Sequence, residues 1–82
     1  RKVPKMKEYT RKPRLSKDTI RKLMDGRTVI RGIYEYSLDK AWNEKRQRFD
    51  EALLRWNDAI EEYEYWILGS KGLYEFEVDK ND

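Results

Sequence analysis

The most regular hydrophobic pattern in the chain lies in residues 39–68. Large aromatic residues recur there every seven positions, and other apolar residues fill the neighbouring positions of the same stripe. Such spacing is typical of an amphipathic α-helix. No Gly or Pro interrupts the stretch, and Gly69 follows it where a helix would end. We therefore expect one long helix over 39–68, with an aromatic stripe that contains Trp42, Phe49, Trp56, Tyr63 and Trp66.

A short helix is expected before this segment, over residues 17–25. Ser16 is a good N-cap residue, and Asp18 places a negative charge in the first turn, where it suits the helix dipole. Gly26 stands just past the end, where a left-handed backbone conformation commonly terminates a helix.

Two strands are expected beside the helices. Residues 28–36 are rich in β-branched and aromatic side chains, and residues 73–78 alternate between two faces, one of them apolar. The predicted fold class is therefore α+β and helix-dominated. An all-α fold is the alternative, because Ile30, Ile33 and Tyr34 also fit one face of a helix.

The N-terminal residues 1–15 form a different kind of segment. They contain both prolines of the chain, few apolar side chains and a basic residue at nearly every second position. Each proline disfavours helix at the residue before it. We expect an extended basic arm over 1–15, followed by a small helical domain over 16–82.

The composition limits the chemistry that the chain can perform. Among its 82 residues, 38% are hydrophobic and 43% charged, so the core is small for the surface it must cover. Ordering a chain of this size costs on the order of 120 kcal/mol, which a small core offsets only marginally. The chain has no Cys and no His, which excludes disulfides, zinc fingers and catalysis by a thiol or an imidazole. We expect no enzymatic activity, no cofactor and no metal site, and a macromolecular partner that adds stability.

The predicted long helix also implies a protein partner. Thirty helical residues would be about 45 Å long, whereas a compact chain of this size is about 30 Å across. Part of the aromatic stripe would then dock onto a second copy or into a larger assembly.

The charges are segregated along the chain, although the net charge is only +3. Residues 1–27 hold 11 Lys and Arg against 3 acids, and residues 49–82 hold 3 against 10. Such a dense basic segment favours contact with nucleic-acid phosphates, DNA or RNA. The expected contact residues are Lys2, Lys5, Lys7, Arg11, Lys12, Arg14, Lys17, Arg21 and Lys22. The predicted function is thus a small non-enzymatic protein that associates with nucleic acid.

Other interpretations remain open at this point. The basic arm could fold back onto the acidic C-terminal half, or the chain could be a protein–protein interaction module, such as an inhibitor or accessory subunit. Within that class, the acidic half could mimic a nucleic acid. A helix-turn-helix over 17–34 fits poorly, because Gly32 and β-branched residues occupy the would-be recognition helix.

The sequence offers no membrane-spanning run and no signal-peptide pattern. We expect a soluble intracellular protein with neither a membrane partner nor a small-molecule substrate.

Overall fold

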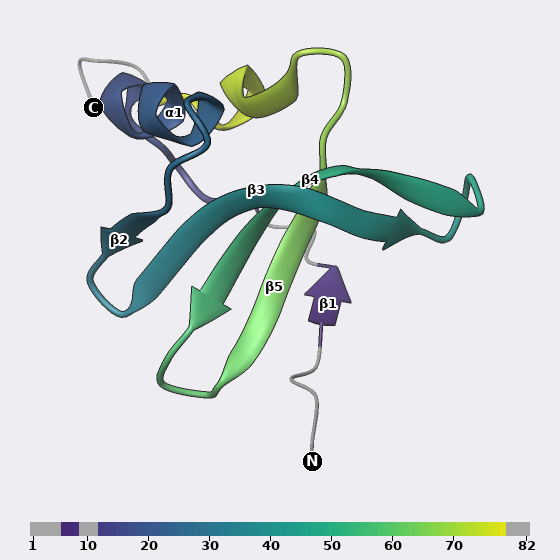
Figure 1. Ribbon diagram of the computed structural model, residues 1–82, viewed down its shortest axis with the longest axis horizontal. Helices are drawn as coiled ribbons and strands as arrows, with labels where there is room; N and C mark the ends of the chain where they lie inside the picture. Colours follow the sequence, from purple (N-terminus) through teal and green to yellow (C-terminus); the bar gives the residue numbers. More distant parts are fainter. Residues whose placement is uncertain (1–5, 9–11, 79–82) are drawn as a thin grey trace.

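The chain folds into a twisted β-sheet with short helices on one side, in a computed structural model that describes residues 6–8 and 12–78 (Figure 1). The sheet has the strand order β1-β5-β4-β3-β2. The strands are β1 (Met6–Glu8), β2 (Val29–Arg31), β3 (Tyr34–Asn43), β4 (Arg48–Asn57) and β5 (Glu62–Ile67). Strands β2 to β5 form an antiparallel meander, and β1 pairs in parallel with β5.

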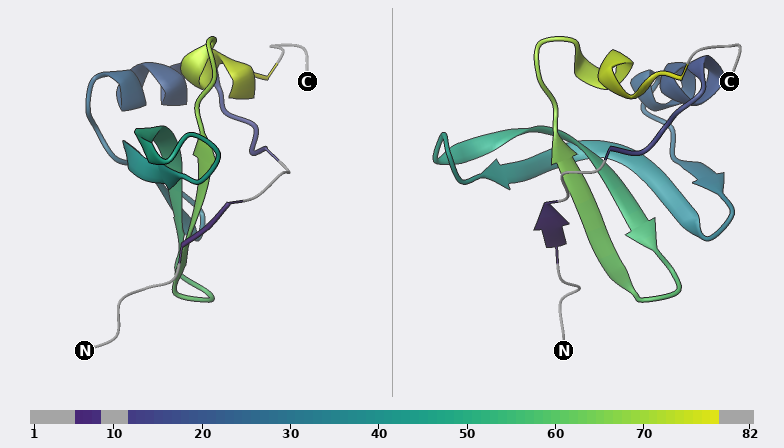
Figure 2. Two further views of the ribbon diagram at one scale, coloured as in Figure 1. Left: turned by 90° about the vertical axis from the view of Figure 1, so that its right-hand side faces the viewer. Right: turned by 180° about the vertical axis from the view of Figure 1, so that it is seen from behind.

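Two helical segments lie on the same side of the sheet, as the two views of Figure 2 show. They are α1 (Lys17–Met24) and the 3₁₀ helix η1 (Gly72–Phe76). Ser16 caps α1, because its hydroxyl oxygen accepts a hydrogen bond of 3.2 Å from the backbone N–H of Thr19. Gly26 follows α1 with φ 84°. The expected short helix and its two end signals are therefore confirmed, with the end at Met24.

The main core lies between these helical segments and the sheet. Alternate residues of the strands point toward α1 and η1 and are buried there, because successive side chains on a strand face opposite sides. The buried residues of this core are Leu15, Ile20, Leu23, Val29, Tyr36, Leu53, Trp66, Leu73 and Phe76. A smaller cluster on the other face of the sheet is built on Ala41, Ala52 and Leu54.

The predicted long helix over residues 39–68 is wrong. This segment forms the second half of β3, then β4 and β5, joined by two tight turns. Strands hold 46% of the described residues and helices 19%, so the helix-dominated fold and its all-α alternative are both wrong. Because the long helix does not form, its length no longer implies a protein partner.

The seven-residue spacing of the aromatics has a different origin, which is the register of two hairpins. Trp42 on β3 lies directly opposite Phe49 on β4, and Trp56 on β4 lies directly opposite Tyr63 on β5. The paired rings meet edge to face, with centroids 5.2 and 4.8 Å apart. Phe49 and Trp56 are also seven positions apart, but they share β4 and therefore face opposite sides of the sheet.

Both expected strands need correction as well. Residues 28–36 contain a hairpin instead of one strand, because Gly32, with φ 64°, opens a two-residue turn between β2 and β3. The strand expected at 73–78 is wrong, since Gly72–Phe76 is the 3₁₀ helix η1. Residues three apart lie on one side of a 3₁₀ helix, and Leu73 and Phe76 are accordingly both buried.

Part of the expected basic arm falls on described residues. Met6–Glu8 form β1, and Leu15 makes an isolated parallel bridge to Glu77 beside η1. Residues 1–5 and 9–11 lie outside the described residues.

Candidate nucleic-acid interface

The hairpin of β3 and β4 extends beyond the rest of the sheet. Strand β2 pairs only with Tyr34–Tyr36 of β3, and β5 pairs only with Ala52–Asn57 of β4. Residues 40–51 therefore project as a two-stranded hairpin end, which we call the ribbon; it is seen at the right of Figure 1 and at the left in the right-hand view of Figure 2. A projecting ribbon of this kind can reach into a groove or along a strand of nucleic acid.

Side-chain hydrogen bonds fix the turn at the tip of the ribbon. The side-chain oxygen of Asn43 accepts hydrogen bonds from the backbone N–H groups of Lys45 and Arg46, at 3.0 and 3.3 Å. Gln47 takes the left-handed conformation with φ 55°, and its side-chain amide donates to the carbonyl oxygen of Glu44 at 2.7 Å. An Asn-initiated turn thus forms without Gly or Pro.

An exposed aromatic pair lies on one face of the ribbon. Trp42 and Phe49 are paired across the two strands, yet 40% of Trp42 and 62% of Phe49 remain accessible to solvent. The Trp42 indole N–H donates to a carboxylate oxygen of Glu44 at 3.1 Å, which restricts the orientation of the ring. This pair offers an apolar, aromatic surface that the fold itself does not cover.

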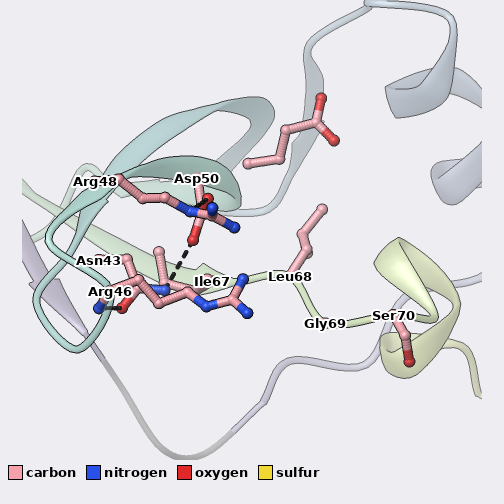
Figure 3. Close-up of a pocket in the computed structure, with 9 residues that line it drawn as sticks. Asn43, Arg46, Arg48, Asp50, Ile67, Leu68, Gly69 and Ser70 are labelled. Carbon is pink, nitrogen blue, oxygen red and sulfur yellow. Dashed lines mark hydrogen bonds and ion pairs between the residues drawn. The ribbon is translucent and has the colours of Figure 1, made fainter.

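Two arginines occupy a groove beside the ribbon. Figure 3 shows Arg46 and Arg48 extending from the ribbon toward Leu68 and Gly69, on the segment that follows β5. The groove has a volume of about 650 Å³. Its lining consists of Asn43, Arg46, Arg48, Asp50, Glu51, Ile67, Leu68, Gly69 and Ser70.

Asp50 positions one of these arginines. Its carboxylate accepts hydrogen bonds from the amide of Asn43 at 2.9 Å and from Nε of Arg48 at 2.8 Å (Figure 3). The hydrogen bond from Asn43, and then Arg48 and Arg46, hold the pKa of Asp50 below its ordinary value, against a smaller opposing effect of desolvation. Asp50 is therefore ionised at neutral pH and holds Arg48 by its Nε. Arg46 forms no ion pair within residues 12–78, so its guanidinium can accept an anionic ligand.

The expected phosphate-binding residues are only partly available in the structure. Ion pairs between described residues include Lys12 with Glu75 at 4.0 Å, Lys17 with Glu77 at 3.7 Å and Lys22 with Asp18 at 3.2 Å. Lys12 and Lys17 thus meet acidic residues from the C-terminal half, as the fold-back interpretation expects. Such surface ion pairs are weak and can exchange for phosphates.

The other expected contact residues divide between exposed positions and undescribed ones. Arg14 and Arg21 are exposed beside and on α1. Lys2, Lys5 and Arg11 lie outside the described residues, as does the side chain of Lys7.

The five aromatics expected to form one protein interface do not share a surface. Trp42 and Phe49 lie together on the ribbon, whereas Trp56 and Tyr63 pair on the opposite face of the sheet. Trp66 is buried in the main core and packs against Phe76 at 6.4 Å between ring centroids. The single stripe was wrong because it rested on a helix that is absent.

Sequence reasoning missed the basic residues of the ribbon, which are Lys40, Lys45, Arg46 and Arg48. They were placed on the predicted helix instead of at a projecting turn, whose strands also carry an exposed aromatic pair. Asn43 and Asn57, the last residues of β3 and β4, were the available signal, because Asn commonly initiates turns.

Comparison of the chain with models of protein families, with curated proteins and with solved structures finds no match. Residues 6–8 and 12–78 include no helix with the length and apolar composition needed to cross a bilayer.

Proposed function

We propose that this protein binds single-stranded nucleic acid, with the β3–β4 ribbon as its contact element. The observation that carries the proposal is the exposed Trp42–Phe49 pair on the same projecting hairpin end as Lys45, Arg46 and Arg48. Exposed aromatic rings and cationic side chains on one element are a combination that binds single-stranded nucleic acids. Arg48 and Phe49 are consecutive on β4 and therefore face opposite sides of the ribbon, so a bound strand would pass around the edge or tip of the ribbon to contact both.

The aromatic pair would contact bases. Every base has a flat π-face, so stacking on an aromatic side chain is tolerant of sequence and is worth about 1–3 kcal/mol per base. A duplex hides those faces, whereas a single strand can present them. The edge-to-face arrangement of Trp42 and Phe49 leaves a large part of both rings free for such stacking.

The basic side chains would contact the phosphates. Arg46 and Arg48 supply planar donors in the groove, and Lys40 and Lys45 add positive charge along the ribbon. The basic residues of the N-terminal segment extend this electrostatic attraction in our proposal. Four acidic residues, namely Asp39, Glu44, Asp50 and Glu51, lie on or beside the same hairpin end, which limits affinity and makes stacking essential.

The test is binding to fluorescently labelled single-stranded DNA and RNA, measured by anisotropy between about 50 and 300 mM salt. We expect binding that weakens steeply with salt, and weaker binding to a duplex of the same sequence. The variant Arg46→Gln/Arg48→Gln should bind less tightly and with a flatter salt slope. The matched control is Arg27→Gln, an exposed arginine in the connection between α1 and β2, far from the ribbon. Absence of binding, or equal loss in both variants, would refute the proposal.

A second candidate function, protein–protein interaction, is favoured by one observation. Strand β2 covers β3 only at Tyr34–Tyr36, so within the described residues the outer edge of β3 from 37 to 43 has no partner strand. Open strand edges can accept a strand from another protein. Along β3 the backbone N–H groups alternate between β4 and the open edge, and that of Lys40 lies on the open side, where it meets only the Asp39 side chain. Capture of a protein partner that is lost when Lys40 is replaced by proline, without any nucleic-acid binding by the wild type, would favour this candidate.

A further inference from the structure

A second pocket lies at the opposite end of β3 from the ribbon, next to the turn between β2 and β3. Its volume is about 350 Å³. The lining residues are Ile30, Gly32, Ile33, Tyr34, Glu35, Trp56 and Asp58. The pocket shares no lining residue with the arginine groove, so it requires its own explanation.

Contacts between two turns hold the pocket open. The backbone N–H of Asp58, just after β4, donates to the carbonyl oxygen of Ile33 at 3.2 Å. Glu35 lies directly opposite Trp56 in the β3–β4 register. The Trp56 indole N–H donates to a carboxylate oxygen of Asp58 at 3.3 Å. The ring of Tyr63, on β5, packs edge to face against the indole. These contacts hold the indole ring and the Asp58 carboxylate, and the strand register places Glu35 next to them.

The chemistry of the lining is apolar with two negative charges. Ile30 and Ile33 are exposed hydrophobic residues, and Trp56 is half-buried between them and Tyr63. No Lys or Arg lines the pocket, and within residues 12–78 neither Glu35 nor Asp58 forms an ion pair. A ligand that complements this lining has an apolar stem and a cationic head.

We propose that this pocket binds an arginine side chain from a partner protein. The methylene stem would lie on Ile30 and Ile33, as long basic side chains commonly cover apolar surface. The planar guanidinium would stack on the Trp56 indole, which is the most favourable aromatic partner for a cation, and would pair with Glu35 and Asp58. The pocket volume suits one side chain, and its two carboxylates repel a phosphate backbone. This site is independent of the nucleic-acid proposal.

The experiment uses a capped peptide, Gly-Gly-Arg-Gly-Gly, and the same peptide with citrulline, which has nearly the same shape but no charge. Both are titrated into the full chain, and the Trp56 indole N–H resonance is followed by NMR. We expect the arginine peptide to shift this resonance in a saturable manner, while the Trp42 indole resonance stays unchanged. The citrulline peptide should bind at least roughly fivefold more weakly.

The variant Glu35→Gln/Asp58→Asn should lower the affinity for the arginine peptide by at least roughly fivefold. Asn at position 58 retains an oxygen that can accept the Trp56 N–H, so the pocket keeps its shape. The matched control is Asp39→Asn, an exposed position on the same strand outside the pocket. Equal binding of the two peptides, an undiminished affinity in the double variant, or shifts at Trp42 instead of Trp56 would each overturn the proposal.

Discussion

Arg55 on β4 and Glu64 on β5 form an ion pair within the sheet, at directly opposite positions of the two strands. Their side chains are only 16% and 6% exposed. The Arg55 guanidinium also lies 4.1 Å from the centroid of the Tyr34 ring and 5.0 Å from that of Trp66. Burial alone would lower the pKa of Arg55, but the hydrogen bonds that its guanidinium donates to Glu64 and Tyr36 outweigh burial and raise this pKa above its ordinary value. Arg55 is therefore a charged residue in the core whose position depends on Glu64.

Glu64→Gln should destabilise the fold, because it leaves the charge of Arg55 buried without its counter-ion. Breaking a buried ion pair costs about 3–5 kcal/mol, and we expect the lower end since Gln can still accept one hydrogen bond. The free energy of unfolding from urea titration measures this cost. Glu35→Gln, at an exposed position, should stay within about 0.5 kcal/mol of the wild type. A loss for Glu64→Gln no larger than that of Glu35→Gln would show that the pair is solvated. Should Glu64→Gln fail to fold, the apolar pair Arg55→Met/Glu64→Leu should restore the fold.

The low pKa of Asp50 predicts a specific pH dependence. Its pKa is lowered in the folded protein by Asn43, Arg48 and Arg46, whereas the unfolded chain has the ordinary value of 3.8. Ionised Asp50 therefore stabilises the fold above about pH 4, and this contribution is lost as the pH falls through the folded-state pKa. The melting temperature of the wild type should exceed that of Asp50→Asn at pH 7, and the difference should shrink steadily below pH 4. A difference that stays constant down to pH 2.5 would contradict this role.

The turn between β4 and β5 contains a residue under backbone strain. Glu61 has φ 53°, a left-handed conformation that costs a non-glycine residue free energy. Glu61→Gly should raise the free energy of unfolding by roughly 0.5–1 kcal/mol, as judged by urea titration. Ala59→Gly in the same turn is the control, because Ala59 has no positive φ and its replacement only adds freedom to the unfolded chain. It should destabilise the protein by about 0.5–1 kcal/mol. Stabilisation by both changes, or by neither, would contradict the assignment of strain to Glu61.

The basic N-terminal segment should contribute to nucleic-acid affinity through charge alone. Replacing Lys5, Lys7, Arg11, Lys12 and Arg14 by Gln removes up to five phosphate contacts. Each lost contact should flatten the slope of log affinity against log salt by about 0.7 for a single strand. Anisotropy titrations at four salt concentrations measure the slope. If the variant bound more weakly but kept the same salt slope, these residues would not be contacting phosphates.

The parts of the fold that depend on local signals could be predicted from the sequence. Helix α1 was found because its cap, its first-turn charge and its terminal glycine all lie within a few residues of one another. The hairpins were missed because their decisive contacts pair residues on different strands, such as Trp42 with Phe49. Two further features hid the turns. Gln47 and Glu61, not glycines, take the left-handed positions, and no proline marks either turn.

For the candidate site, the sequence showed which residue types are present but not how the fold arranges them. Trp42 and Phe49 were expected to dock onto a protein, as part of a stripe on a helix, and were not connected with nucleic acid. Arg46 and Arg48 could not be assigned to a groove from the sequence, because only the folded ribbon brings them close to the segment after β5. Counting charges along the sequence favoured the N-terminal segment, because the basic residues are densest there. Such a count does not show which basic residues the fold brings onto the same element as exposed aromatic rings.

The proposed ribbon interface binds a single strand by stacking of bases on the Trp42–Phe49 pair. The most direct measurement compares Trp42→Ala/Phe49→Ala with Tyr74→Ala, an exposed aromatic on η1, in binding to a labelled single-stranded oligonucleotide. Both variants should fold, because the changed side chains lie outside both core clusters. We predict that the ribbon variant loses at least about tenfold in affinity with an unchanged salt slope, since stacking releases no counterions, while Tyr74→Ala binds like the wild type. An affinity of the ribbon variant equal to that of Tyr74→Ala would show that the ribbon aromatics do not stack on the bound strand.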